Sequence, residues 1–580
     1  MNNVNQKNVN IYISTFIFVI YMAIFIWSRF HLVGIHFTHY DDLYVPYLFS
    51  VLGSYDSTYF GLQISKYGGD FGSYLAPWLT GFMNEHQLIF EALKKTLVPI
   101  AIAKSSTFAP LQFFLTAALI NLKVSYEYSL ISSRLSSAIF SLATLIMFWQ
   151  FAKYYITELR YYLLLVGGGL IAFSWMFLVY SSQAENYAAG PFSVICLFYI
   201  YAKYSQKNIN LRESIFLGLM ISILPLLHYQ ALFFLPGFYL GLMYSNRNSF
   251  LLKLRQWAPV VFINFVIVLL TYYVFIRHSL DKSPGVGWNA GPNFQYIFNA
   301  SCGNGPLLCA INVFGNNVLD VVQSIVSFSE LGSLVSVLYA SIVIIISILG
   351  LIRILKSQDM LVSGLGVMIS SVLLVWIILV LNKTLAFSPT RHSLVLLIPI
   401  AIMASYGAYS IKSFFKLALC NKFEYLLAVI FLGLAALYIL NFDHQKNDRL
   451  DPFSQLNIEQ LVQDFNVGTI VTYGHTLNIR LVPFVMNEYS ENFENVKPYL
   501  LVYKSSKRNP DSIMVVCASA ALCKPVESKQ SIDILNHITG QASNYNLTYQ
   551  YERKSNVLNC FGSKAGLGSN SVYLGVWSKN

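Results

Sequence analysis

Charged residues are scarce in this chain, at 11% of 580 residues, whereas hydrophobic residues make up 56%. An ordinary soluble domain carries about 25% charged residues, so this composition excludes a soluble protein of that length. Apolar runs of roughly 18 to 25 residues recur along the chain, and such runs are long enough to cross a hydrocarbon core about 30 Å thick as helices. The sequence therefore predicts an α-helical polytopic membrane protein.

Cysteine is also rare: the chain has seven, with neither a Cys-x-x-Cys motif nor the Cys/His spacing of a metal site. No repeat of fixed period occurs, and the only biased tract is an Asn-rich N-terminus. These absences exclude zinc modules and repeat architectures. Cys302 and Cys309 fall in a predicted outer loop, where an oxidising exterior permits a disulfide between them.

The net charge of +11 comes from basic residues that collect in short loops between apolar runs, such as Arg353 with Lys356. Such loops are cytoplasmic by the positive-inside rule, which excludes nucleic-acid binding and places the N-terminus inside. About eleven crossings place every basic loop on the cytoplasmic side, provided that 213–245 is a hairpin and 96–122 is an interfacial or re-entrant segment. The predicted location is therefore a membrane, with the chain passing through it many times.

The expected organisation is a transmembrane domain over 1–441, whose first outer loop is 34–130, followed by an extracytoplasmic soluble domain over 442–580. Hydropathy falls after about residue 442, and charges of both signs mix there. Stretches with strand patterning (468–473, 513–517 and 573–577) alternate with helical ones, of which 458–465 is the first. This pattern predicts a small mixed α/β domain.

An acidic pair, Asp41 and Asp42, follows the first apolar run. Two adjacent carboxylates at the outer end of a span indicate an acid/base or metal-binding site, although a solvated loop pair or a helix N-cap is the simpler alternative. Four further polar clusters fall at predicted outer ends of spans. They centre on Arg134, on Gln183 to Tyr187, on His228 with Tyr229 and Gln230, and on Arg391 with His392.

Ionisable groups near hydrocarbon are costly, so a shared placement on one face indicates function. Each cluster also has a structural alternative. Arg134 and Arg391 could extend to lipid headgroups, with His392 as an interfacial aromatic. Gln183 and Glu185 could simply cap a turn, and His228 could be a satisfied histidine at a helix end. The hairpin 213–245 offers only about sixteen residues per crossing, roughly 24 Å of helix, so His228 at its apex is expected below the membrane surface, at the floor of an outward cavity.

The order of these segments resembles the GT-C class of membrane glycosyltransferases, which includes protein O-mannosyltransferases and lipid A aminoarabinose transferases. The matching stretches are 39–43, 109–111, 134–138, 183–188, 228–229, and 391–392 with Pro399. Three departures concern the donor sugar and any metal. Ala109 and Pro110 replace a basic Pro-Pro motif, for which Lys104 is the available substitute; Glu185 stands where the turn often has Arg; and His392 replaces Tyr.

The resemblance implies an inverting glycosyltransferase that moves a sugar from a polyprenyl-phosphate carrier to a glycolipid, lipopolysaccharide or protein acceptor in the cell envelope. The implied place is the outer face of a bacterial inner (plasma) membrane, and the implied partners are donor, acceptor and membrane lipids. Asp41 is the implied base, with Asp42 in support. Arg134, Arg391 and Lys104 are the implied phosphate ligands. The sugar or metal pocket would be formed by His39, Gln183, Glu185, Tyr187, His228, Tyr229 and His392.

The sequence leaves open whether a divalent metal ion is a cofactor, and Asp42 or His228 would be its ligand. Two other functions stay open as well. An O-antigen ligase or polymerase usually carries its functional Arg and His residues in a large late loop, whereas the acidic pair here follows the first span. A membrane transporter should show internal symmetry and ionisable residues near span midpoints, and the sequence shows neither.

Overall fold

The computed structural model describes helices of the membrane domain and strands of a small sheet. The described residues are 2–33, 109, 111, 115, 126–182, 186–273, 318–327, 334–381, 391–414, 420–449, 458–473, 490–492, 500–504, 511–518, 535–536, 540–553 and 572–579. They belong to two compact units. Of these residues, the larger unit holds 2–33, 109, 111, 115 and those from 132 to 441, and the smaller holds 126–131 and those from 442 onward.

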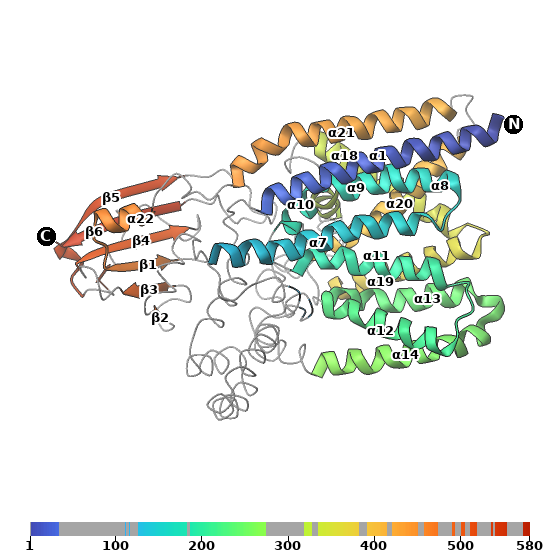
Figure 1. Ribbon diagram of the computed structural model, residues 1–580, viewed down its shortest axis with the longest axis horizontal. Helices are drawn as coiled ribbons and strands as arrows, with labels where there is room; N and C mark the ends of the chain where they lie inside the picture. The colour runs from blue at the N-terminus through green and yellow to red at the C-terminus, as the bar shows by residue number, and fades with distance from the viewer. Residues whose placement is uncertain are drawn as a thin grey trace, which may run out of the picture. The chain divides into compact units, whose positions relative to one another are not determined.

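The larger unit is a bundle of helices that lie side by side (Figure 1). Its long helices are α1 (Asn2–Val33), α7 (Tyr126–Ala152), α11 (Ala189–Tyr204), α12 (Leu211–Leu227), α14 (Phe250–Thr271), α18 (Leu334–Leu355), α19 (Met360–Leu381), α20 (Leu397–Phe414) and α21 (Cys420–Arg449). Shorter helical segments are α8 (Thr157–Tyr162), the π-helix η1 (Leu163–Gly167), α9 (Gly168–Phe173), α10 (Trp175–Ser181) and α13 (Leu235–Ser245). Short segments of 3₁₀-helix are η2 (Asn186–Ala188), η3 (Tyr229–Phe234), η4 (Arg247–Ser249) and η7 (Arg391–Leu396).

Among the described residues, seven helices are long and apolar enough to cross a membrane. The bent pair Glu158–Phe173 and Trp175–Ser181 adds an eighth if it is one crossing. The other three segments counted in the expected eleven are α11, α12 and α13, of 16, 17 and 11 residues. The described chain is therefore mostly helical, as expected for a membrane protein, and the total of eleven stays a prediction.

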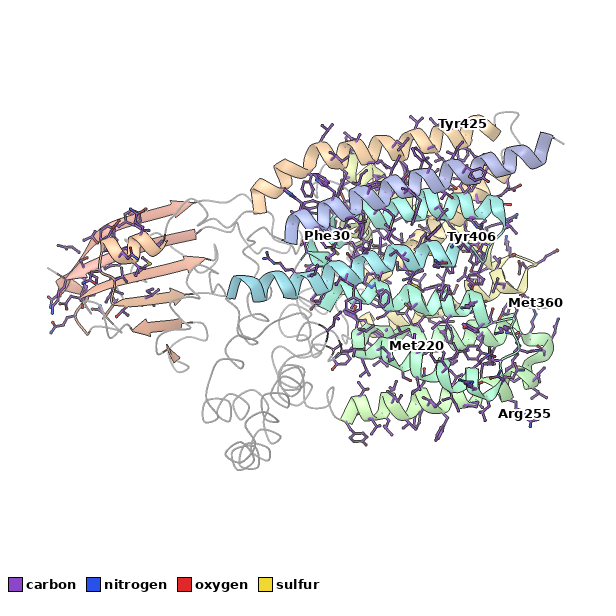
Figure 2. The ribbon with its side chains drawn as sticks, viewed as in Figure 1. Phe30, Met220, Arg255, Met360, Tyr406 and Tyr425 are labelled. Atoms are coloured by element: carbon purple, nitrogen blue, oxygen red, sulfur yellow. The ribbon has the colours of Figure 1, made fainter. Side chains whose placement is uncertain are left out.

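Large apolar side chains remain exposed on the outer helices of this unit. Among them are Phe30 of α1, Met220 of α12 and Tyr425 of α21, whereas Tyr406 of α20 is buried (Figure 2). A water-soluble protein rarely leaves so much apolar surface exposed. In a lipid bilayer these apolar faces carry no such penalty, because they contact hydrocarbon chains instead of water.

Two glycines set how closely α18 and α20 pack. A methyl group on Gly350 would overlap the carbonyl oxygen of Met403, and one on Gly407 would overlap that of Ile346. Small residues that let two backbones approach are a recurring feature of helix contacts in membranes. The α18–α20 contact is therefore a close backbone-to-backbone packing that larger residues would prevent.

One helix of the bundle is interrupted at Ser174, where the chain bends by 58° between α9 and α10. The Ser174 hydroxyl caps α10 by accepting from the N–H of Phe177 and donates to the carbonyl of Ile325 at 2.5 Å. The N–H of Trp175 binds the carbonyl of Ser327 at 2.8 Å. Residues 318–327, part of the expected polar outer loop 277–332, are thus a buried helical segment packed against the interruption.

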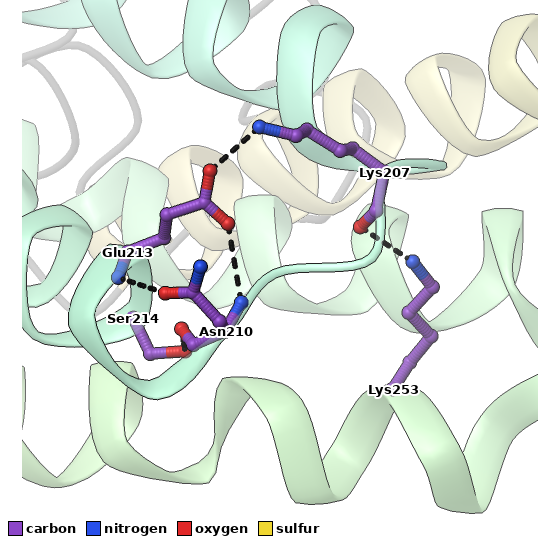
Figure 3. A network of polar contacts seen from close by, with 5 residues as sticks. All are labelled: Lys207, Asn210, Glu213, Ser214 and Lys253. Carbon is purple, nitrogen blue, oxygen red and sulfur yellow. Dashed lines mark hydrogen bonds and ion pairs between the residues drawn. The ribbon is translucent and has the colours of Figure 1, made fainter.

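Helix α12 begins with a capping box in which Asn210 and Glu213 satisfy each other's backbone N–H groups (Figure 3). Lys207 forms an ion pair with Glu213 at 2.6 Å. Lys253 of α14 donates to the carbonyl of Lys207 at 2.7 Å. The short basic connection before α12 therefore has an ordered polar structure that ties it to α14.

The smaller unit contains a six-stranded mixed sheet in the order β2-β3-β1-β4-β6-β5. Its elements are α22 (Ile458–Asp464), β1 (Thr469–Tyr473), β2 (Ser490–Asn492), β3 (Leu500–Lys504), β4 (Ser512–Ala518), the 3₁₀ turn η8 (Ala542–Asn544), β5 (Tyr545–Arg553) and β6 (Val572–Lys579). Strands β1 and β4 pair in parallel, with Thr469 opposite Ile513, and the other pairs are antiparallel. The strands expected at 468–473, 513–517 and 573–577 are confirmed.

Candidate functional site

Three of the polar clusters expected from the sequence meet in the larger unit. The 3₁₀ segments η2, η3 and η7 all contact α11, and η2 also contacts η7. Gly190 shows how close they come, because a methyl group there would lie 2.8 Å from Cγ1 of Val395 and 3.3 Å from Nδ1 of His228. The turn before α11, the break after α12 and the start of α20 therefore form one neighbourhood.

The break at His228 has a local cause. The backbone of His228 is extended, with φ −155° and ψ 117°, so α12 ends at Leu227, and Pro225 within its last turn lacks the N–H that would bond back along the helix. The N–H of His228 still binds the carbonyl of Leu224 at 3.1 Å. Residue 228 is therefore held at a helix end, as the hairpin prediction requires.

An aromatic ring packs against the imidazole of His228, and a second ring packs against the first. Tyr187 of η2 meets it edge to face, with ring centroids 5.8 Å apart, and Tyr180 of α10 contacts Tyr187 at 5.6 Å. His228 is only 4% exposed and Tyr187 7%. The imidazole thus lies in a largely apolar, water-poor environment.

Three consecutive side chains after α12 place polar atoms in this interior, and these atoms form no hydrogen bond with the described residues. Among the described residues, Nδ1 of His228, the hydroxyl of Tyr229 and Oε1 of Gln230 have no hydrogen-bond partner. All three side chains are at most 5% exposed. A buried polar atom without a partner costs about 1–3 kcal/mol, so three in a row indicate a place where a polar ligand or ordered water completes the bonding.

Arg134 of α7 is buried, with 1% of its surface exposed. Helix α7 runs parallel to α11, because Phe140 contacts Phe192 and Phe151 contacts Phe198. Arg134 precedes Phe140 along α7, so this pairing brings it toward the level of the turn that begins α11. Its burial argues against a side chain that merely extends to lipid headgroups.

The structure does not describe the side chains of the remaining expected site residues. His39, Asp41, Asp42, Lys104, Gln183 and Glu185 lie outside the described residues, as do the side chains of Arg391 and His392. The backbone of Arg391 and His392 begins η7, in the neighbourhood of His228. Within the described part of the chain, no three His, Cys, Asp or Glu side chains gather as metal ligands would.

Two residues that the sequence analysis gave no role stand out in the structure. Gln230 adds an unpartnered polar atom beside His228 and Tyr229. Arg29 is buried in α1, with 1% of its surface exposed. An arginine near the end of an apolar run was the available signal, because charges in such runs rarely lack a role.

No protein-family model, curated protein or solved structure matches this chain.

Proposed function

We propose that this protein is an inverting glycosyltransferase of the GT-C type, which transfers a sugar from a polyprenyl-phosphate carrier to an acceptor hydroxyl outside the membrane. One observation carries the proposal: His228, Tyr229 and Gln230 offer polar atoms that are buried and unpartnered among the described residues, where three of the expected clusters meet. A sugar is a ligand rich in hydroxyl groups that both donate and accept. Such a ligand matches an imidazole nitrogen, a phenol and an amide oxygen in an apolar wall.

In the proposed reaction, the Asp41 carboxylate takes the proton of the acceptor hydroxyl. The acceptor oxygen forms a bond to the anomeric carbon on one face while the bond from that carbon to the phosphate oxygen breaks on the other. The products are the glycosylated acceptor and polyprenyl phosphate. Arg134 and Arg391, with Lys104, are the proposed partners of the departing phosphate, since guanidinium groups match phosphate oxygens in pairs.

The remaining assignments follow from the same proposal. Asp42 supports the base, and Asp42 or His228 is the proposed ligand of a divalent metal ion. His39, Gln183, Glu185, Tyr187 and His392 complete the sugar pocket. The proposed location is a bacterial plasma membrane, with the N-terminus inside and residues 442–580 outside.

A single variant tests the chemistry. General-base catalysis contributes about 10²- to 10⁴-fold, so Asp41→Asn should lose that much turnover while donor binding and membrane insertion persist. The assay uses the full chain and the lipid-linked sugar that accumulates in cells lacking it. Asp359→Asn, at an exposed carboxylate that accepts from the N–H of Leu361 at the start of α19, is the matched control and should keep its turnover. Wild-type turnover in Asp41→Asn would remove Asp41 from the mechanism.

A transporter is the second candidate, because the interruption at Ser174 is a feature that transporters use at substrate sites. The two functions differ in their outcome: a transferase forms a new glycosidic bond, whereas a transporter moves its substrate unchanged. Purified protein in detergent should form a glycosylated acceptor if it is a transferase. Sugar or lipid flux across sealed vesicles without any new glycosidic bond would favour the transporter.

A further inference from the structure

The guanidinium of Arg29 is a buried charge near the C-terminal end of α1. Its side chain is 1% exposed, and within the described residues it forms no ion pair with a carboxylate. A buried arginine without a counter-charge is expensive, since the desolvation of an ion costs several kcal/mol. Such a charge is expected either to clamp neutral groups or to meet an anion brought by a ligand.

Neutral groups satisfy only one side of this guanidinium. Nε donates to Oγ of Ser181 at 3.2 Å, and Nη1 lies 3.1 Å from both the Ser28 hydroxyl and the Ala172 carbonyl. Nη1 is also 3.3 Å from the hydroxyl of Tyr438. In the part of the chain that the structure describes, Nη2 has no acceptor.

Two aromatic rings also pack around the guanidinium. The ring of Phe25 lies 3.6 Å from its central carbon, and the ring of Phe177 lies 5.7 Å away. The N–H groups of a guanidinium lie in its plane, so further hydrogen bonds form only at its edge. The Nη2 edge is therefore the one position at which Arg29 has hydrogen-bonding capacity to spare among the described residues.

Arg29 is linked to the proposed sugar site by a short chain of contacts through α10. It binds Ser181, the last residue of α10; the preceding residue, Tyr180, contacts Tyr187; and Tyr187 contacts His228. The phosphate of a sugar-phosphate lipid is bonded directly to the sugar, so a phosphate ligand must lie beside the sugar pocket. Arg29 and the proposed sugar pocket contact adjacent residues of α10, Ser181 and Tyr180, which favours Arg29 as such a ligand.

We propose that Arg29 is a further phosphate-binding residue, whose Nη2 edge holds the phosphate of the polyprenyl carrier within the bundle. This inference rests on the proposed function. Phenylalanine rings and fixed neutral acceptors orient the side chain in advance, so little side-chain entropy is lost on binding. The polyprenyl chain would extend along the lipid-exposed surface of α1.

Ligand-dependent thermal stabilisation of the purified full chain in detergent tests the inference. The probes are polyprenyl phosphate, the uncharged polyprenol of the same length, inorganic phosphate and an anionic phospholipid. We expect stabilisation by polyprenyl phosphate alone, and Arg29→Gln should weaken that affinity by at least about tenfold, the range for a lost charged hydrogen bond. Arg247→Gln, at an exposed arginine, is the matched control and should bind normally.

Tyr438→Phe separates phosphate binding from a purely structural clamp. It removes one neutral acceptor of Arg29, so a clamp predicts that it lowers the melting temperature as Arg29→Gln does, with phosphate affinity unchanged in both variants. That result would overturn the inference and leave the proposed function intact. If Arg29→Gln does not fold, Arg29→Lys replaces it, and wild-type affinity in that variant would overturn the inference equally. A wild-type protein that does not distinguish polyprenyl phosphate from polyprenol or from the phospholipid would contradict the proposed function itself.

Discussion

The ring of Tyr187 meets the imidazole of His228 edge to face, at 5.8 Å between centroids. The contact joins the turn that precedes α11 to the break that ends α12. Gly190 brings η7 close to the same histidine, since a methyl group there would lie 3.3 Å from Nδ1 of His228 and 2.8 Å from Cγ1 of Val395. The candidate site is thus built from helix ends, where backbone direction changes and polar side chains enter an apolar interior.

Gln230→Leu should raise stability and lower activity. The substitution removes a buried carbonyl oxygen that has no partner among the described residues, so the protein without ligand is expected to gain up to about 1–3 kcal/mol. If the same oxygen accepts a hydroxyl of the donor sugar, donor affinity should fall about tenfold. Melting temperature and donor affinity are measured separately, with Gln150→Leu, which only loses a bond to Lys153, as control. A loss of stability together with unchanged affinity would contradict the assignment.

Much of the bundle could be predicted from apolar runs and turn residues. The helix end at His228 followed from the short hairpin and the polar apex, and the strands of the small sheet followed from their patterning. Each of these features depends on residues near one another in sequence. Local patterning is therefore sufficient to place them.

Other features depend on contacts between distant residues, and the sequence does not reveal them. The run 160–181 has the hydropathy of one continuous span, yet Ser174 interrupts it, supported by backbone groups of Ile325 and Ser327. The segment 318–327 belongs to a stretch expected to be a polar outer loop, but it is a buried helical segment in which Gln323 and Ser327 both bind Ser336. Likewise, the partners of Arg29 come from α9, α10 and α21.

Arg134→Lys should weaken donor binding. Lysine keeps the charge but loses the paired N–H groups that match phosphate oxygens, so affinity should fall in Arg134→Lys and further in Arg134→Gln. A side chain that only reached headgroups would tolerate lysine fully. Donor affinity and turnover are measured for both variants, with the exposed Arg353 substituted in the same two ways as control. Full activity in Arg134→Lys would leave the phosphate without this partner.

Asn264 should stabilise the contact of α14 with α12 and α13. Its Nδ2 donates to the Gly218 carbonyl and to Oγ of Ser222, both at 2.7 Å, and its Oδ1 accepts from the Tyr239 hydroxyl at 2.9 Å. Asn264→Leu and Tyr239→Phe should each lower the melting temperature. The double variant should lose less than their sum, by a coupling of about 0.6 to 1.7 kcal/mol. Strict additivity would show that the two side chains do not interact in the membrane, and Asn248→Leu, at an exposed position, is the control.

Gly407→Ala should destabilise the bundle although it adds only one methyl group. That methyl group would overlap the carbonyl oxygen of Ile346, and backbone cannot move aside as a flexible side chain can. Separation of α18 from α20 is therefore expected, at a cost of about 1–3 kcal/mol, with a lower melting temperature in detergent. Gly433→Ala of α21 is the matched control, because no described atom lies within 4 Å of its added methyl group, and its melting temperature should stay the same or rise slightly. Equal melting temperatures for the two variants would mean that α18 and α20 do not pack backbone to backbone.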